Sequence, residues 1–439
     1  MPSHRDAHIR YAKHFLQVIW DASKLCEQGG EEFQRGSASF DQALDNIKQA
    51  HDWIMRNASE DVDAATLCSN YPDAGAYICD LRLHPQQRII WDEAGLKAAR
   101  QLNNRGAERT HLNNLGLAYF GLGYPLRALD HHQAVISIHR ELNDLRGEAG
   151  SLNNLGMCYA ATGNPTKASK LFSKSLQLCR RVGDLNGEWS ALNNLGLAYG
   201  DLGEHRTAIS FHKQGLIVAR KRRDLRREAI ALGNLGLSYA ALGDYKQAVE
   251  WYEQQLTVAR DIHDIRAEAN ALNNLGVAQR RLGDANKALR IHERSLYLFG
   301  SCGDLRGKGT VMGNIGLNYA VLGDVARAIE FLQCDLKISR DVGNRREEGT
   351  ALGNLGILHK QRGDLKMAIE CYQQQLQIAR ETDDRGSEGR ALWNLSLLLT
   401  KIGNVIQAIR HAQFALRVFE LIESPDQDMV RRALALWAA

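Results

Sequence analysis

The chain has 439 residues, of which 44% are hydrophobic and 24% are charged, and a formal net charge of +4. This composition excludes a disordered chain, and the near balance of charge does not favour a nucleic-acid partner. No apolar run approaches the roughly 20 residues that cross a bilayer, and the first residues lack the apolar core of a signal peptide. We therefore expect a cytoplasmic protein that has neither a membrane nor a nucleic acid as its partner.

The first 70 residues contain two helical patterns. Apolar side chains at helical spacing mark one face of a helix before the Gly-Gly pair at 29–30 and one face of a second helix after it. These side chains are Tyr11, Phe15, Val18, Ala22 and Leu25, followed by Phe40, Leu44, Ile47 and Ile54. We expect residues 1–70 to form a helical cap or linker region.

From residue 71 onward the chain repeats itself every 40 residues. Eight clear copies run from HLNNLGLAYFGLG (111–123) to ALWNLSLLLTKIG (391–403) without insertion or deletion. A degenerate ninth copy precedes them, with WDEAGLKAARQLNN (91–104) as its second helix and a first helix expected at about 71–84. The array is therefore expected to span 71–423, and 424–439 to form a C-terminal capping helix that begins at Ser-Pro-Asp.

Each copy is predicted to contain two helices, and glycine is placed to shape them. In the fourth copy the helices are expected at about 227–241 and 245–260. Gly236 lies inside the first helix, where Gly costs about 1 kcal/mol relative to Ala, so we expect close packing of Ala248 from the second helix against it. Gly243 is expected to end the first helix in a left-handed conformation, and Asp244 to cap the second.

Identical side chains recur at the same place in every copy. The most regular row is an Asn row on the first helices, and its members are Asn114, Asn154, Asn194, Asn234, Asn274, Asn314, Asn354 and Asn394. Two further rows are charged. An Arg ends most second helices (Arg100, Arg140, Arg180, Arg220, Arg260, Arg340 and Arg380), and a Glu begins most first helices (Glu108, Glu148, Glu188, Glu228, Glu268, Glu348 and Glu388). These signs suit the helix dipoles, and we expect structural Arg–Glu pairs between helices.

The repeat resembles the tetratricopeptide repeat (TPR) in a long, 40-residue form. In the fourth copy the matching residues are Leu235, Gly236, Tyr239, Ala248, Tyr252 and Ala259. The N-L-G and L-G-D signatures are similar to those of the LGN/Pins polarity scaffolds and of bacterial NB-ARC (STAND-class) signalling ATPases. In residues 1–70, Arg10, Ala12, Phe15, Leu44, Asp45, Asn46, Ile47, Ala50 and Trp53 resemble the segment that joins a winged-helix domain to the TPR array in those ATPases.

This resemblance implies an all-α, right-handed TPR superhelical solenoid of helix-turn-helix repeats, in which the first helices line a concave face. Side-chain amides both donate and accept hydrogen bonds, so an Asn row on that face suits the backbone of an extended peptide, which the LGN-like scaffolds bind. Alternatively, each Asn bonds the helix of a neighbouring repeat and sets the stacking. One row is able to do both.

Residues near the Asn row vary and are candidates for specificity. An Asn precedes the row in four copies, and Asn153, Asn193 and Asn273 are the candidates among them, whereas the eighth copy has Trp393 at this position. Arg280, Lys360 and Arg390 are expected to attract an acidic ligand, and Trp393 to supply an apolar anchor together with Phe120 and Met157.

No constellation for catalysis, metal binding or cofactor binding is apparent. GDLRGKGT (303–310) has neither the spacing nor the Ser or Thr of a P-loop. The eight Cys lack C-x-x-C spacing, and we expect them to be reduced, buried small residues. We therefore predict a non-enzymatic module without cofactor that captures a protein or peptide, acidic groups being favoured. The sensor half of a STAND regulator, whose partners would include its own ATPase domain, is the expected setting, and an LGN-like scaffold is the alternative.

Overall fold

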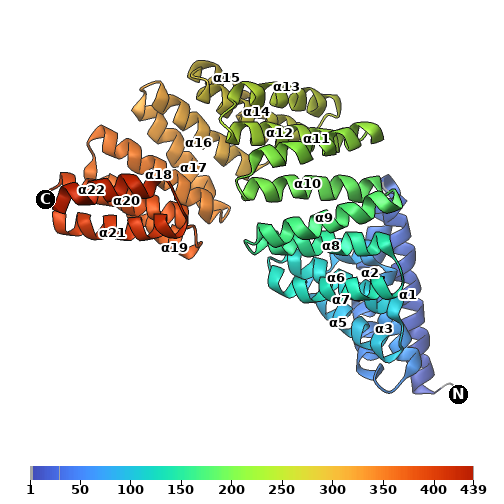
Figure 1. Ribbon diagram of the computed structural model, residues 1–439. Helices are drawn as coiled ribbons and strands as arrows, with labels where there is room; N and C mark the ends of the chain where they lie inside the picture. Colours follow the sequence, from blue (N-terminus) through green and yellow to red (C-terminus); the bar gives the residue numbers. More distant parts are fainter. Residues whose placement is uncertain (1–2, 29, 439) are drawn as a thin grey trace. The chain divides into compact units, whose positions relative to one another are not determined.

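The computed structural model describes residues 3–28 and 30–438, and this described part of the chain is all α-helical. It divides into two compact units, residues 1–222 and 223–439. Unit 1 contains α1 (His4–Gln28), α2 (Gly30–Asn57), α3 (Val62–Ala74), α4 (Ala76–Arg82), α5 (Pro85–Gln101), α6 (Arg105–Gly121), α7 (Pro125–Glu141), α8 (Leu145–Ala161), α9 (Pro165–Val182), α10 (Leu185–Asp201) and α11 (His205–Arg222) (Figure 1).

Unit 2 continues the series of helix pairs and ends on a single helix. It contains α12 (Leu225–Ala241), α13 (Tyr245–Asp261), α14 (Ile265–Arg281), α15 (Ala285–Ser301), α16 (Leu305–Val321), α17 (Val325–Asp341), α18 (Arg345–Arg362), α19 (Leu365–Glu381), α20 (Arg385–Lys401), α21 (Val405–Leu421) and α22 (Asp426–Ala438). Within the described residues, no helix has the length and apolar character needed to traverse a bilayer.

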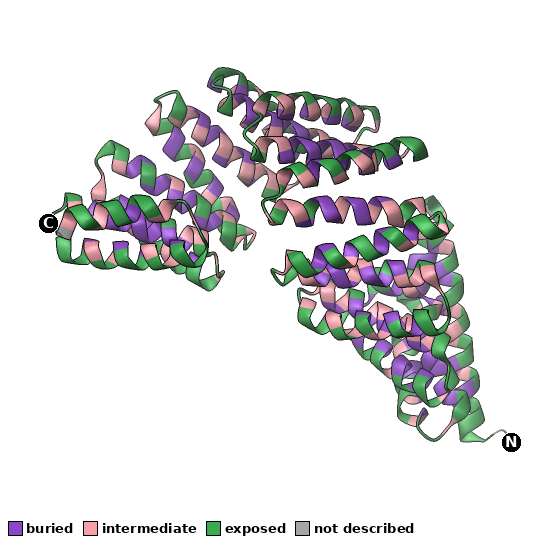
Figure 2. Ribbon diagram, viewed as in Figure 1, coloured by how far each residue is buried: buried purple, intermediate pink, exposed green. Residues whose placement is uncertain are grey.

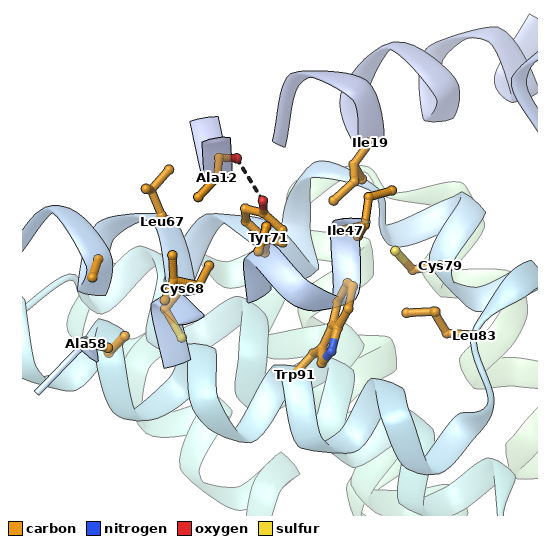
Figure 3. Packing of buried hydrophobic residues seen from close by; sticks show 14 of the residues in the cluster. Ala12, Ile19, Ile47, Ala58, Leu67, Cys68, Tyr71, Cys79, Leu83 and Trp91 are labelled. Atoms are coloured by element: carbon orange, nitrogen blue, oxygen red, sulfur yellow. Dashed lines mark hydrogen bonds between the residues drawn. The ribbon is translucent and has the colours of Figure 1, made fainter. Parts of the chain in front are cut away.

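The N-terminal helices α1 to α5 share one apolar core. Phe40 and Ile47 of α2 are fully buried, as the predicted face of that helix requires, and they pack with Tyr71 and Trp91. On α1 the buried side chains include Ile19, which the predicted face did not contain, whereas Tyr11, Phe15, Val18 and Leu25 of that face are only half-buried. Figure 3 shows this cluster, in which the Tyr71 hydroxyl donates a 2.7 Å hydrogen bond to the carbonyl of Ala12. This core holds α1 and α2 against the start of the array.

The helix predicted at about 71–84 is wrong. The chain instead forms α3 over Val62–Ala74, which packs against α5, and then the short α4 after a break at Gly75. Asp61 starts α3 early, because its carboxylate accepts hydrogen bonds from the backbone N–H groups of Asp63 and Ala64. At the break, a side chain at position 75 would collide with Ile19 of α1, so only Gly allows this close crossing.

In both units, each first helix packs against its own second helix, and every first helix that has a second helix before it in the same unit packs against that one too. First helices of successive repeats also contact one another, as α14 does with α12 and α16. The buried residues lie where these helices meet, and the outer faces are exposed (Figure 2). We call the surface of the first helices that carries the Asn row the inner face of each unit.

The predicted ends of the helices in the fourth copy are confirmed. Gly243 has a φ of +80° and follows α12 directly, so it occupies the left-handed region that disfavours other residues. Asp244 then caps α13, where its Oδ1 accepts a 3.1 Å hydrogen bond from the backbone N–H of Gln247. Local residue chemistry therefore sets where one helix stops and the next begins.

The partner predicted for the mid-helix Gly is wrong. The group against Gly236 is the ring of Tyr252, not Ala248, and a Cβ at position 236 would overlap that ring. The same arrangement recurs, with the residue 16 positions later lying over each Gly: His132 on Gly116, Phe172 on Gly156, His212 on Gly196, His292 on Gly276, Leu332 on Gly316 and Tyr372 on Gly356. In the last copy Ser396 replaces the Gly and Ala412 replaces the ring, and both are fully buried. The two positions are therefore matched in size.

The predicted Arg–Glu pairs are confirmed within the units. In six of them the Arg Nε lies 2.6–2.9 Å from a Glu Oε1, and the pairs are Arg100–Glu108, Arg140–Glu148, Arg180–Glu188, Arg260–Glu268, Arg340–Glu348 and Arg380–Glu388. Between α15 and α16 both members are absent together, since Gly300 and Lys308 stand in their places. Six of the eight Cys are buried as expected, whereas Cys302 is half-buried and Cys334 is exposed.

Candidate binding face on the first helices

The inner face combines the half-buried Asn row with a second row of partly exposed aliphatic side chains. These aliphatic residues stand three positions after each Asn, on the same side of the helix. They are Leu117, Met157, Leu197, Leu237, Val277, Leu317, Ile357 and Leu397. Leu237 and Ile357 are 50% and 52% exposed. Sequence reasoning missed this row apart from Met157, although its signal, the second apolar residue of N-L-G-L, was visible.

Some members of the Asn row stack one repeat on the next. Asn194 Nδ2 donates to Asn153 Oδ1 at 3.0 Å in unit 1, and Asn314 Nδ2 donates to Asn273 Oδ1 at 2.9 Å in unit 2. In each case the acceptor lies on the preceding first helix, one position before its own row member. Within α10, Asn193 Nδ2 donates to Asn194 Oδ1 at 3.4 Å and so helps to orient the amide that reaches Asn153. These amides hold neighbouring repeats in register.

The remaining members of the row outside these pairs have different environments. Asn114 Nδ2 donates to Asp92 Oδ1 of α5 at 3.3 Å. Asn234 is half-buried on α12, where its backbone carbonyl accepts from the Ser238 hydroxyl at 2.8 Å. The side chain of Asn154 has no hydrogen-bond partner within the described chain.

Other members of the row have an unused donor. Among the described residues, no acceptor bonds the Nδ2 groups of Asn274, Asn354 and Asn394, although Asn274 Oδ1 accepts from Asn273 at 3.5 Å. Each of these three follows a repeat with Gly at the position that Asn153 and Asn273 occupy elsewhere. The acceptor that Asn153 offers to Asn194, and Asn273 to Asn314, is therefore absent for these three. Stacking, one of the two roles anticipated for the row, therefore involves only some of its members.

The Gly residues at this position make room for a longer polar side chain from the second helix. The nearest atoms to a Cβ built on Gly233, Gly313 and Gly353 belong to Gln255, Asp335 and Gln375 respectively, at 2.7, 2.6 and 2.5 Å. Where the first helix has Asn153, Asn193 or Asn273, the second helix has only Ser175, Gly215 or Ser295. In these six repeats the longer polar side chain therefore comes from one helix or the other.

The predicted basic residues have different environments. Arg280 is half-buried on α14, and its guanidinium donates to the backbone carbonyl of Asn314 at 3.0 Å and to the side chains of Asn314 and Asn318 at 3.4 Å. Burial lowers the pKa of Arg280 to about 10, and no carboxylate pairs with it in the described structure. Lys360 is half-buried. Arg390 is exposed, and its guanidinium donates to the Ser387 hydroxyl at 3.1 Å.

Trp393 is not on the open surface, contrary to what an apolar anchor requires. It is 9% exposed, and its ring stacks on Trp437 of α22 with a centroid separation of 5.9 Å. The last helix therefore covers Trp393. The sequence pointed to this helix as a cap but did not identify which side chain it shields.

A buried polar cluster lies below the first clear repeat, and sequence reasoning missed it. His111 Nε2 is 3.4 Å from the Ser69 hydroxyl, and His111 Nδ1 is 3.3 Å from Asp92 Oδ1. The order Ser–His–Asp is that of a nucleophilic triad, but each of the three is at most 2% exposed. A substrate has no access to Ser69 here, so the cluster belongs to the packing between α3, α5 and α6.

A separate groove lies between α1 and α2. It has a volume of ≈ 680 Å³ and is lined by residues that include Tyr11, Lys48 and Arg56. His8 stacks on Trp53 beside it, with ring centroids 4.8 Å apart. In the part of the chain that the structure describes, no group of three or more His, Cys, Asp and Glu side chains has the arrangement of a metal site.

Comparison with known proteins identifies the repeat. A family model described as tetratricopeptide repeat matches residues 147–221, 227–299 and 308–381, and a second model with the same description matches 109–144. No curated protein matches the sequence.

Several solved structures share the fold at low sequence identity. Aspartyl phosphate phosphatase F from Bacillus subtilis is 11% identical with a TM-score of 0.56, and the match covers 86% of this chain and 95% of that one. The apo quorum sensor NprR from B. thuringiensis is 14% identical with a TM-score of 0.56, covering 79% and 99%. A STAND protein with a tetratricopeptide repeat sensor from Pyrococcus horikoshii is 14% identical with a TM-score of 0.55, covering 84% and 55%.

Proposed function

We propose, from the premise that this chain belongs to the tetratricopeptide repeat family, that it is a non-enzymatic module that binds a protein partner through an extended peptide segment. The segment lies along the inner face of unit 2. The observation that carries this proposal is the set of unused Nδ2 donors on Asn274, Asn354 and Asn394. Half-buried amides that are not used in packing are suited to the carbonyl groups of an extended backbone.

The aliphatic row beside these amides supports the same proposal. Leu237 and Ile357 are large, half-exposed apolar side chains next to the Asn row. A peptide whose main chain bonds the amides places alternate side chains toward this row, where their burial contributes about 25 cal/mol per Å² of apolar surface. Polar and apolar groups at the same 40-residue spacing favour a ligand that runs along the repeats.

Charge adds a preference for an acidic group in the ligand. Arg280 is fixed by Asn314 and Asn318 and has no carboxylate partner among the described residues, so an acidic ligand side chain near it forms a charge-assisted hydrogen bond. Lys360 and Arg390 extend the same charge along the face. The amides of Asn153, Asn193 and Asn273 bond to members of the Asn row, so they contribute to ligand binding indirectly, by positioning that row.

For the biological setting, we propose the ligand-sensing part of a STAND-type regulator in the cytoplasm. The likeness to the P. horikoshii STAND protein supports this setting at the level of fold. Its partners then include its own ATPase domain, residues 1–70 act as a cap or linker, 71–423 as the array and 424–439 as the closing cap. The alternative is an LGN-like scaffold, and an in-frame P-loop domain encoded upstream of Met1 would decide for the sensor.

The test of binding uses a partner identified by pull-down and mass spectrometry, whose affinity is then measured by calorimetry. Asn354→Ala with Asn394→Ala removes two donors, each worth about 0.5–1.5 kcal/mol, and we expect Kd to rise by about tenfold or more. Gln254→Ala removes an exposed amide on the outer helix α13 and is expected to leave Kd unchanged. Equal affinity of the double variant and the wild type would contradict the proposal.

A further inference from the structure

One second helix of unit 2 places an acidic group against the first helix of its repeat, next to the inner face. Asp335 of α17 stands where Gln255 and Gln375 stand in two other repeats, and its carboxylate lies directly over Gly313 of α16. It is only 4% exposed. Asp335 Oδ1 accepts one hydrogen bond, from the Ser339 hydroxyl at 3.3 Å, and Oδ2 has no partner among the described residues.

A Ser at this position has a packing role that a carboxylate does not fulfil. Ser175 and Ser295 each donate a 2.8 Å hydrogen bond to a backbone carbonyl of their first helix, those of Ala149 and Ala269. The corresponding carbonyl in the repeat of Asp335 belongs to Gly309. Among the described residues, Asp335 forms no hydrogen bond with that carbonyl, and its carboxylate accepts from Ser339 instead. Asp335 is therefore not a substitute for Ser in holding the two helices together.

The carboxylate also lacks a counter-charge. No Lys or Arg within the described residues forms an ion pair with Asp335, and Glu347 is close enough to add to the burial that raises its pKa to about 7. A buried charge without a partner is costly, and buried carboxylates in proteins are normally paired. A buried carboxylate that fills space but leaves Oδ2 without a partner and has no counter-charge is a candidate site for a cation from outside the chain.

The carboxylate of Asp335 lies against Gly313 of α16, at the position that Asn153 and Asn273 occupy beside the Asn row in other repeats. Only a narrow part of the side chain, 4%, is exposed there. Asn354 follows on α18 at the position from which Asn314 and Asn194 reach back in their own repeats, and its amide is unused. Leu317, one turn after Gly313, is half-buried beside them.

We propose that Asp335 binds the cationic side chain of a Lys or Arg in the peptide that occupies this face. The inference rests on the proposed function and deepens it. Because Arg280 lies on α14 and Asp335 on α17, the ligand then presents an acidic and a basic side chain in a fixed order along the repeats. Asp335 is the specificity determinant for the basic one.

The repeats themselves supply the variants that test this. Asp335→Asn keeps the size of the side chain and removes its charge. Gly313→Asn with Asp335→Ser copies the arrangement of Asn273 and Ser295 in the preceding repeat, which the fold already accommodates. Asp341→Asn removes an exposed carboxylate at the end of the same helix and is the matched control.

The probe is a displayed library of random 12-residue peptides, selected separately on the wild type and on each variant. We expect wild-type and Asp341→Asn selections to enrich Lys or Arg at one fixed position, and both Asp335 variants to lose that enrichment. A synthetic peptide in which Gln replaces this residue is expected to bind the wild type about tenfold more weakly, but to bind Asp335→Asn with unchanged affinity.

Each outcome separates this inference from the proposed function. Enriched peptides without a basic position, or a basic position that persists on Asp335→Asn, would overturn the role of Asp335 and leave peptide binding intact. Failure of the wild type to enrich any peptide would overturn both. A thermal melt of each variant supplies a second readout: Asp335→Asn is expected to melt no lower than the wild type, since it removes an unpaired buried charge.

Discussion

A buried ring against a mid-helix Gly makes a prediction that runs opposite to helix propensity. In α8, Gly156 lies under Phe172, and a Cβ on residue 156 would stand 2.5 Å from Phe172 Cε1. Carbon atoms in contact prefer about 3.5–4.0 Å. The same helix contains Gly150, around which no atom lies within 4 Å of such a Cβ. Two Gly→Ala changes in one helix are therefore expected to differ in sign.

The magnitudes follow from these two environments. Gly150→Ala removes a Gly from a helix interior and is expected to stabilise the protein by about 0.5–1 kcal/mol. Gly156→Ala gains the same propensity but forces Phe172 to move, and overpacking of this kind costs about 1–3 kcal/mol. We expect a net loss of about 1–2 kcal/mol for Gly156→Ala. Phe172→Ala alone is expected to cost about 3–5 kcal/mol, because the ring is buried.

The double variant isolates the contact. With Phe172→Ala in place, Gly156→Ala has room and is expected to be neutral or stabilising, so the coupling energy between the two sites is about 1–3 kcal/mol. Urea unfolding followed by far-ultraviolet circular dichroism measures all four proteins and the Gly150→Ala control. If Gly156→Ala proves as stable as Gly150→Ala, ring packing is not the reason for Gly at this position.

Three further predictions concern protons, stacking and the absent ion pair. Burial lowers the pKa of His212 to about 4 from about 6.5 in an unfolded chain, so the folded state binds fewer protons than the unfolded state. The contribution of His212 to the free energy of unfolding is therefore complete above pH 6.5, and up to about 3 kcal/mol of it is lost as the pH falls toward 4. His212→Phe, which copies Phe172, is expected to flatten the plot of urea midpoint against pH, and an unchanged slope would contradict this. Asn314→Ala is expected to lower stability in thermal melts by about 1 kcal/mol whereas Asn354→Ala leaves it unchanged, and equal losses would refute the division of roles. Gly300→Arg with Lys308→Glu restores the ion pair that α15 and α16 lack and is expected to raise the melting temperature by an amount equivalent to about 1 kcal/mol. A lower melting temperature would contradict a stabilising role for this pair.

Features set by neighbouring residues could be predicted from the sequence. The end of α12 and the start of α13 follow from Gly243 and Asp244 respectively, because a left-handed Gly and an N-cap Asp act within one helical turn. The early start of α3 depends on the same chemistry at Asp61. The repeat period, however, predicts the first helix of the degenerate copy at 71–84. Periodicity locates copies well and locates a degenerate copy poorly.

Contacts between distant residues were harder to foresee. The side chain over each Gly comes from 16 positions later, and the joint change to Ser396 and Ala412 is the signal in the sequence for that pairing. Whether an Asn is used for stacking depends on the preceding repeat, so Asn314 and Asn354 look identical in the row and behave differently. Trp393 looks like an available apolar anchor in the sequence, because the residue that covers it, Trp437, is 44 residues away in a segment that does not follow the repeat.

The matching of bulk to Gly has a consequence for how such a chain changes in evolution. Both members of each matched set, such as Gly313 with Asp335 or Gly156 with Phe172, lie in the same 40-residue repeat. A recombination event that duplicates or deletes one whole repeat therefore carries both halves of the fit with it. The interior survives, while the order of amides, carboxylate and guanidinium along the surface is rewritten. Such an array is able to acquire a new ligand preference in a single genetic step without first passing through an unfolded ancestor.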